Sequence, residues 1–350
     1  MPDGPLMISA DSHVIEDPHL WETRLPAKLR EAAPVFPERG VGGQFQAHQG
    51  GWDPLARVEE MAVDGVSQEV LYPSLAMNLF GLTDPALQEA CFSVYNDWLL
   101  EYCSAAPDRL FGIGALCTFD VTQAVRELRR CKAAGFVGAM VWEVPPPELS
   151  FATDHYEELW AVAEELRMPI SLHILTGASY GWPKPRAARR VLQATARHAN
   201  DLVYEASNAI SDLITTGVLE RFPALKFVLV ESEASWIPFI LSSWDKYASR
   251  PNSDSPLTMA PSDYFRRNVH ATFFNDPTLA SVLERWGSAN CMWSNDYPHP
   301  NSTWPESRKI IERDLGHLPD EVRREVLSGN VARLYDLPAA SGRQGASPAS

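Results

Sequence analysis

The sequence predicts a (β/α)8 barrel with a long irregular insertion after the first strand and extra helices at the C-terminal end. Short apolar segments alternate with segments of helical periodicity over most of the 350 residues. Eight apolar segments are each followed sooner or later by a helix, which favours a closed parallel barrel. An open doubly wound sheet is the alternative, but the sequence lacks the Gly-rich phosphate loop that usually follows its first strand.

The elements follow from apolar periodicity and from turn residues. The predicted strands cover residues 6–10, 67–72, 110–117, 137–144, 169–175, 226–230, 268–274 and 291–293. The predicted helices cover residues 55–63, 85–105, 121–134, 156–166, parts of 186–216, 237–247, 278–286 and 320–327. The second of these helices carries apolar residues at spacings of three and four from Leu87 to Tyr102. Gly135 and Gly329 stand where helices usually end.

Two stretches depart from the regular pattern. Residues 17–54 are rich in Pro and Gly, and we interpret them as an irregular insertion with at most a short pair of strands. Loops of this length are usually lids or linkers. We assign residues 1–338 to a single domain and expect residues 339–350, which are small and polar, to form a disordered tail.

Composition excludes several classes of protein. A net charge of -15 argues against a nucleic-acid partner, which requires clustered Lys and Arg. The sequence has five cysteines, an odd number, and none of them forms a CxxC pair. We therefore expect reduced thiols in the core and a cytoplasmic location. We expect neither a secretion signal nor a membrane span. The expected partner is a small-molecule substrate, and we expect a homo-oligomer, most simply a dimer.

Polar side chains that can bind a ligand stand at the ends of four predicted strands. Asp11 and His13 end the first strand, His173 lies on the fifth, Glu231 ends the sixth, and Asp296 follows the eighth. Because the C-terminal ends of barrel strands meet at one mouth, we expect these side chains to converge. Such a nitrogen and oxygen set suits Zn²⁺, Mn²⁺ or Fe²⁺.

Each of these residues alone has an ordinary structural explanation. Asp296 could open an Asp-x-Pro turn, and His173 could be a core histidine bonded to the backbone. His13 could cap a helix, and Glu231 could be a solvated residue. A shared cation nevertheless satisfies all of them at once, whereas a buried His or Glu without a partner is costly. The joint pattern therefore favours a metal site.

Five stretches of the sequence are similar to the amidohydrolase-related family, which includes aminocarboxymuconate semialdehyde decarboxylase, resorcylate-type decarboxylases and several lactonases. They are ISADSHVIEDPHLWETRLP, SLHI, FVLVESEASWIPF, MWSNDYPHPNSTWPES and SGNVARLYDL, which together lie within residues 8–337. The resemblance implies a barrel with one divalent metal ion, held by Asp11, His13, His173 and Asp296. Zn²⁺ is the first expectation and Mn²⁺ the second.

The sequence departs from the family pattern at two positions. The first motif is often His-x-His, but Asp11 supplies a carboxylate here, which shifts the preference slightly toward Mn²⁺. Glu231 stands where many relatives have a histidine, so it is either an additional ligand or a replacement for a catalytic group. The fourth strand offers Met140, Trp142 and Glu143 but no lysine that could be carbamylated, so the expectation is one metal rather than two.

Two chemistries suit such a site. In non-oxidative decarboxylation, which the resemblance favours, Asp296 or a nearby acid protonates the carbon that loses CO₂. In hydrolysis of an amide, ester or lactone, Asp296 or Glu231 is the general base toward a metal-bound water. A catalytically degenerate metal-binding barrel is the third possibility. His299 could orient Asp296 or transfer protons.

Aromatic and basic residues near the strand ends favour an aromatic or cyclic acid as the substrate. The tryptophans are Trp52, Trp142, Trp182, Trp236, Trp293 and Trp304, about half of which we expect to pack in the core. Arg186, Arg189 or Arg190 could bind a substrate carboxylate, although a solvated helix face explains them as well.

Overall fold

Eight parallel strands form the centre of the computed structural model, which describes residues 5–36, 48–177, 191–250 and 257–339, with 191–198 as backbone only. In these residues the strands form one sheet in the order β1 to β8, which confirms the predicted barrel. The strands are β1 (Ile8–His13), β2 (Gln68–Tyr72), β3 (Leu110–Ala115), β4 (Gly138–Val141), β5 (Ile170–His173), β6 (Phe227–Val230), β7 (Val269–Phe273) and β8 (Cys291–Trp293).

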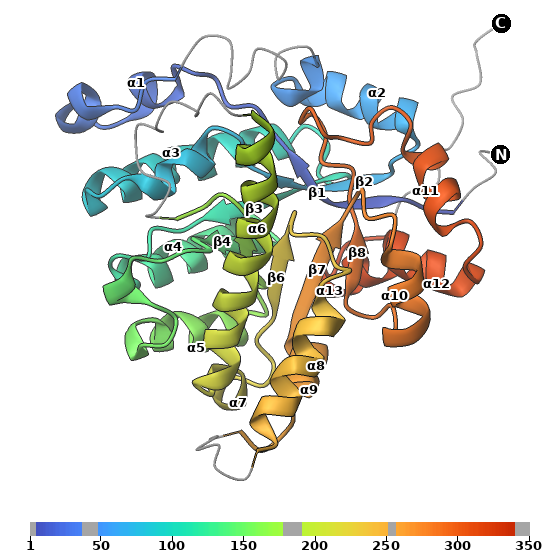
Figure 1. Cartoon of the computed structure of the whole chain (residues 1–350). Coiled ribbons are helices and arrows are strands. Elements are labelled where there is room, and N and C mark those ends of the chain that lie inside the picture. Colours follow the sequence, from blue (N-terminus) through green and yellow to red (C-terminus); the bar gives the residue numbers. More distant parts are fainter. Residues whose placement is uncertain (1–4, 37–47, 178–190, 251–256, 340–350) are drawn as a thin grey trace, which may run out of the picture.

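The helices surround the strands, as Figure 1 shows. They are α1 (Leu20–Arg24), α2 (Pro54–Asp64), α3 (Pro85–Cys103), α4 (Val121–Ala134), α5 (Glu157–Leu166), α6 (Val191–Thr215), α7 (Val218–Arg221), α8 (Ile237–Ala248), α9 (Pro261–Asn268), α10 (Leu279–Trp286), α11 (Ser307–Leu315), α12 (Asp320–Arg324) and α13 (Asn330–Tyr335). None of the helices in the described residues is both long and apolar enough to cross a membrane.

Local sequence explains where several helices begin and end. Asp53 and Asp84 each cap a helix by accepting bonds from its first backbone N–H groups, and a proline follows each of them. Gly65 and Gly135 end α2 and α4 with φ of 77° and 101°, a conformation that favours glycine. Helix α4 matches its predicted bounds for this reason.

The described part of the insertion contains helix α1 and short 3-10 helices and no strand, whereas residues 37–47 of the insertion lie outside the described residues. Trp21 of α1 is buried and donates a hydrogen bond to the Cys91 carbonyl of α3. The predicted helix end at Gly329 is wrong. Gly329 does not end a helix. Its φ of -63° is helical, and the chain continues through a π-turn into α13. Residues 340–350 lie outside the described part.

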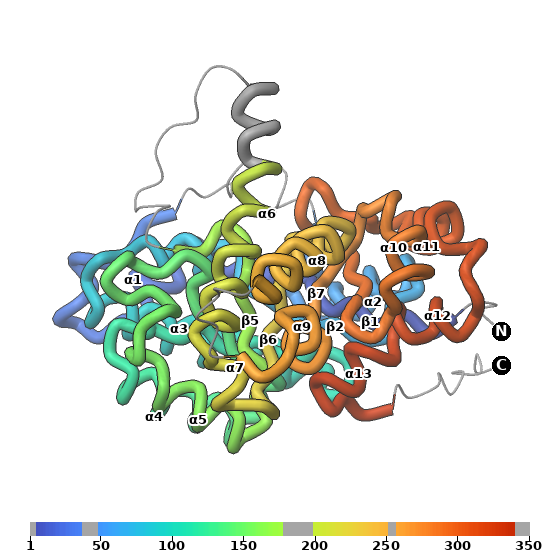
Figure 2. Tube along the Cα trace, turned by 60° about the horizontal axis from the view of Figure 1, so that its bottom comes forward, coloured from blue at the N-terminus to red at the C-terminus, as the bar shows by residue number. Residues whose placement is uncertain are grey.

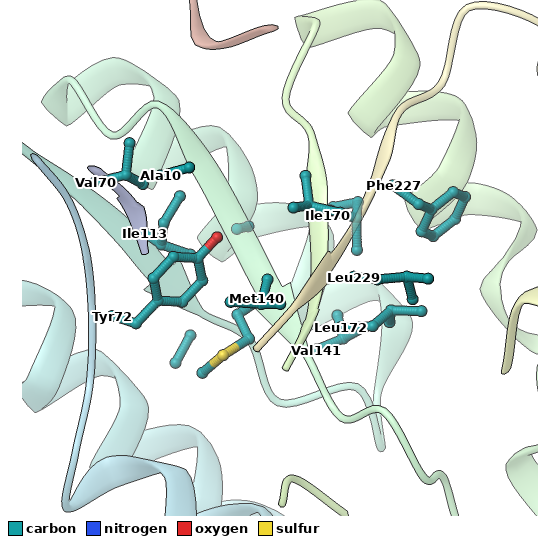
Figure 3. Close-up of a cluster of buried hydrophobic side chains, with 14 of the residues drawn as sticks. Ala10, Val70, Tyr72, Ile113, Met140, Val141, Ile170, Leu172, Phe227 and Leu229 are labelled. Carbon is teal, nitrogen blue, oxygen red and sulfur yellow. The ribbon is translucent and has the colours of Figure 1, made fainter. Parts of the chain in front are cut away.

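The core joins the strands to one another and to the helices. Strand residues are buried throughout, with His270 as the partly exposed exception among the described strands. This is the pattern expected for parallel strands covered on both faces. Figure 3 shows side chains from six consecutive strands, Ala10 of β1 to Leu229 of β6, in one buried cluster.

The barrel closes between its first and last strands. The Asp296 N–H donates to the Asp11 carbonyl at 3.1 Å, and the His13 N–H donates to the Tyr297 carbonyl at 2.6 Å. Strand β1 has an irregular register against β2 between Ser9 and Ser12, as at a β-bulge. The seam is therefore made by the backbone of Tyr297 and of three residues that the sequence predicts as ligands, Asp11, His13 and Asp296.

Candidate metal centre

Side chains from four strand ends converge at the mouth of the barrel. We use the term metal centre for Asp11, His13, His173, Glu231 and Asp296. The ligand atoms of the first four lie within 4.8 Å of one another, and so do those of His13, Glu231, Asp296 and the neighbouring His299. Four members of the centre are fully buried, whereas the side chain of Glu231 is 13% exposed. The structure thus brings together every residue proposed as a ligand.

The two histidines of the centre present the same ring nitrogen to it. Nδ1 of His13 lies 2.7 Å from the Pro73 carbonyl, and Nδ1 of His173 lies 2.9 Å from the Ile174 carbonyl. A carbonyl only accepts, so we assign the proton of each neutral ring to Nδ1. The Nε2 atoms, 3.2 Å apart, then direct two lone pairs at one point. This arrangement is typical of histidines that bind a metal ion.

The carboxylates surround the same point. Asp11 Oδ1 lies 3.4 Å from Nε2 of His13, and Asp296 Oδ1 lies 3.6 Å from that atom. Glu231 Oε2 lies 3.7 Å from Nε2 of His173. Both carboxylate oxygens of Asp11 are buried without a hydrogen-bond partner among the described residues. A cation at this point would stabilise a buried carboxylate in this state, so the residues fit the metal ion that the sequence predicts.

Burial determines the protonation of the centre when no metal ion is bound. It lowers the pKa of His13 to about 4 and that of His173 to about 3, so both rings are neutral at pH 7. Burial, followed by the charges of Asp296 and Asp11, raises the pKa of Glu231 well above its usual range. Burial and Asp11 do the same to the pKa of Asp296. A bound cation would oppose these effects on the carboxylates, because it favours their ionised form.

The backbone at two strand ends is strained. Glu231 and Asp296 have φ of 62° and 53°, in the left-handed region that residues other than glycine seldom adopt. Such positions cost about 1–3 kcal/mol each and cluster at functional sites. The Glu231 N–H donates to Oγ1 of Thr272 at 2.8 Å, which fixes this turn. In this conformation both side chains reach the centre.

His299 links the centre to the loop after β2. Its Nδ1 lies 2.8 Å from Asp296 Oδ1, and its Nε2 lies 3.1 Å from Oγ of Ser74. The ring also stacks on that of His13, with centroids 3.8 Å apart. Burial lowers the pKa of His299 to about 4. The imidazole is therefore placed to orient Asp296 and to exchange a proton with it.

Sequence reasoning missed the groups that support the centre. Oδ1 of Asn295 lies within 2.8 Å of the Ser12 hydroxyl and 3.1 Å of the Ser9 hydroxyl, which joins β1 to the end of β8. Arg57 is fully buried, donates to the His13 carbonyl at 2.7 Å and pairs with Glu69 at 2.5 Å. The sequence could have indicated a role for Asn295, because it directly precedes Asp296. It gives no sign of the ion pair between Arg57 and Glu69.

The residues proposed near the substrate divide into several groups. Trp142 and Trp293 are buried, and the indole of Trp142 donates to the Tyr156 hydroxyl. Trp236 and Trp304 donate to backbone carbonyls, and Trp52 is 42% exposed. The remaining candidates lie outside the described residues: Trp182, Arg186, Arg189 and Arg190.

Comparison with known proteins identifies the family to which the chain is similar. The family model for amidohydrolases matches residues 11–337. The gamma-resorcylate decarboxylase of Rhodococcus jostii (strain RHA1) is 29% identical over 261 residues, which cover 69% of this chain and 75% of that protein. The gamma-resorcylate decarboxylase of Rhizobium sp. (strain MTP-10005) is 27% identical over 273 residues, which cover 70% and 76%.

A solved structure has the same fold. The dihydroxybenzoic acid decarboxylase from Polaromonas sp. JS666, with bound manganese and the inhibitor 2-nitroresorcinol, matches 95% of this chain and 98% of that chain. The TM-score is 0.70 and the sequence identity is 21%. This likeness shows a common barrel.

Proposed function

Because this chain belongs to the amidohydrolase family, we propose that it is a metal-dependent carboxy-lyase that removes CO₂ from an aromatic carboxylic acid without oxidation. The observation that carries the proposal is the buried metal centre beside the pair formed by Asp296 and His299. The two gamma-resorcylate decarboxylases at 27% and 29% identity support decarboxylation over hydrolysis. We therefore propose an aromatic acid with a hydroxyl group next to its carboxylate.

Each residue of the centre has a proposed role. Asp11, His13 and His173 would hold the ion. Asp296 would complete the ligand set in the absence of substrate and, once the substrate binds the ion in its place, would carry the proton that the reaction needs. A bound divalent ion would supply a positive charge that orients the substrate carboxylate and its neighbouring oxygen. When the bond between the ring carbon and the carboxylate breaks, its electron pair remains on that carbon. Asp296 then delivers a proton to this carbon and recovers one through His299.

The donor set supports Mn²⁺ over Zn²⁺. Two imidazole nitrogens and the carboxylates of Asp11, Asp296 and Glu231 form an oxygen-rich site, which suits Mn²⁺ better than a site of histidines alone. The decarboxylase from Polaromonas sp. JS666 was solved with manganese. We also propose a cytoplasmic location, because the five cysteines are buried free thiols. A homodimer stays a prediction.

The test combines metal analysis with a substrate panel. Purified protein is loaded with Mn²⁺ or Zn²⁺ and assayed for CO₂ release from 2,6-dihydroxybenzoate, other hydroxybenzoates and a panel of lactones. We expect chelator-sensitive CO₂ release. Asp296→Asn should lower kcat by about 10²–10⁴-fold, because it removes the acidic proton. Asp263→Asn, on the exposed surface of α9, is the matched control and should leave kcat unchanged.

Other outcomes would contradict the proposal. Acid release from a lactone without CO₂ release would identify a hydrolase. Tight metal binding without turnover of any substrate would indicate a degenerate barrel. Full activity of Asp296→Asn would exclude the role given to this residue.

A further inference from the structure

A basic pocket lies at the end of the barrel opposite the metal centre. The cavity has a volume of about 500 Å³ and contains Ala163, Pro169 and Leu334 among its lining. Its ionisable lining residues, which define the basic pocket, are Arg167, Lys226, Arg266, Arg267, Arg333 and His270. None of the described residues that line it carries a carboxylate. A concentration of cations is unexpected in a chain with a net charge of -15.

The topology explains why these cations meet. Arg167 follows α5 and precedes β5, Lys226 precedes β6, and residues 266–267 end α9 just before β7. Arg333 comes from α13, which packs at the same end. Figure 2, in which the bottom of Figure 1 comes forward, shows α7, α9 and α13 on this side. The pocket is thus built from the N-terminal ends of β5 to β7, far from the strand ends that hold the metal centre.

Several of these cations are not neutralised. Arg266 lies 3.7 Å from Asp263. Within the described segments, no carboxylate lies in ion-pair range of Arg167, Lys226 or Arg267, although a hydrogen bond from Tyr264 and the charge of Arg267 lower the pKa of Glu220. Lys226 donates to the Arg267 carbonyl at 2.5 Å, and Arg267 donates to the Leu219 carbonyl. Arg333 pairs with Glu325. The charge of the pocket is therefore positive.

Two further observations favour the binding of an anion here. Nδ1 of His270 is buried and has no hydrogen-bond partner among the residues that the structure describes. Burial and the charge of Arg267 lower the pKa of Lys226, so the ammonium group lies in an environment that disfavours its charge. A bound anion would satisfy the imidazole and compensate the cations together.

A helix-capping role explains only part of the arrangement. Lys226 and Arg267 bind carbonyl groups at the ends of α9 and α7, where a cation interacts favourably with the helix. Arg167 is exposed, and no hydrogen bond of its side chain is found in the described part of the chain. Its guanidinium can therefore bind an anion through two parallel hydrogen bonds, in a bidentate manner.

We propose that the basic pocket binds a small molecule that carries a phosphate-like dianion. Arginines match phosphate oxygens geometrically, and several unpaired cations around one cavity favour a doubly charged group over a single carboxylate. The volume of the cavity fits a small organic phosphate rather than a macromolecule. This site is separate from the metal centre and does not rest on the proposed decarboxylase activity.

The test is calorimetric titration of the Mn²⁺-loaded protein with inorganic phosphate, at a constant ionic strength maintained with NaCl. Arg167→Glu should weaken binding by about tenfold or more, because it reverses a charge that contacts the anion. Lys132→Glu is the matched control. Lys132 is exposed in the last turn of α4, just before β4, but does not line the pocket. It should change the affinity by less than about twofold.

Two further variants make the result decisive. Arg266→Gln, at a half-exposed position, should also weaken binding and guards against misfolding of Arg167→Glu. His13→Ala should retain binding, because it alters only the metal centre. Equal losses of phosphate affinity with Arg167→Glu and Lys132→Glu would show that binding depends only on the net charge of the protein. That result, loss of binding with His13→Ala, or no binding by the unaltered protein would overturn the proposal.

Discussion

Glu231 carries an unfavourable combination of burial, charge and backbone strain. Its carboxylate lies 3.7 Å from Nε2 of His173, and burial together with Asp296 and Asp11 raises its pKa well above the usual range. Its φ of 62° adds local strain. Residues kept at such a cost usually serve function rather than stability. We interpret Glu231 as part of the centre rather than as a solvated strand end.

The variant Glu231→Gln separates the contribution of Glu231 to function from its cost to stability. We expect the variant to have a higher Tm than the unaltered protein when both are metal-free, because it removes a carboxylate that is expensive to bury next to Asp296. We expect it to lose metal affinity and activity in the loaded state. Calorimetry of both forms checks this. Glu148→Gln, an exposed control, should leave Tm unchanged, and a lower Tm of metal-free Glu231→Gln would contradict the argument.

At the scale of elements, the loop after β2 is held by one buried side chain. The carboxylate of Glu16 accepts hydrogen bonds from three consecutive backbone N–H groups of residues 74–76, at 2.8 to 3.2 Å. The same loop contacts the centre twice, through the Pro73 carbonyl on His13 and the Ser74 hydroxyl on His299. Glu16 therefore positions two rings that it does not touch.

This role of Glu16 predicts a dependence of stability on pH. Burial raises the pKa of Glu16 from 4.5 to about 7, so the folded state holds its proton longer than the unfolded state. Its contribution to stability is then complete below pH 4.5 and is lost as the pH rises to about 7. Relative to Glu16→Gln, which cannot titrate, the unaltered protein should lose about 3 kcal/mol of unfolding free energy over this interval.

Urea unfolding of both proteins at several pH values measures this difference. The difference between the two proteins cancels the titration of other groups and should be constant above the interval. If the unaltered protein gains stability over Glu16→Gln as the pH rises, Glu16 is ionised in the folded state and the interpretation is wrong.

At the scale of the whole molecule, the metal centre joins the first strand of the barrel to the segment after the last strand. Its ligands come from β1, β5, β6 and the segment after β8, so the ion would bind the folded chain and not the unfolded one. Chelation should therefore lower Tm. At a free metal concentration 1000-fold above Kd, binding contributes about 4 kcal/mol.

Calorimetry with and without EDTA, followed by readdition of Mn²⁺, checks this expectation. His13→Ala is the control, because it should unfold at the same temperature with or without the chelator. An unchanged Tm of the unaltered protein after complete metal removal would show that the centre contributes nothing to folding.

Local patterns predicted what depends on nearby residues. The bounds of β8 and α4 were predicted correctly, because an apolar run that stops at polar residues and a C-cap glycine are local signals. The convergence of Asp11, His13, His173, Glu231 and Asp296 followed from barrel topology, since each stands at a strand end. Distance along the chain does not matter for such a prediction once the fold class is correct.

Other features required contacts that the sequence does not reveal. Gly329 is helical because Asn330 donates to the Ser288 and Cys291 carbonyls, which anchors the following turn to β8. The buried pair of Arg57 and Glu69 reads in the sequence as two ordinary charged residues. Its position behind His13 depends on tertiary packing alone.

The seam between the first and last strands has a consequence for biosynthesis. Asp11 and His13 are synthesised before their partners at the seam, which are Asp296 and Tyr297; Asp296 follows 285 residues after Asp11. A chain still emerging from the ribosome can therefore form β1 to β7 without having a complete set of ligands. The complete ligand set exists only after Asp296 has been synthesised, so a product truncated before Asp296 would lack one ligand and the seam that closes the barrel.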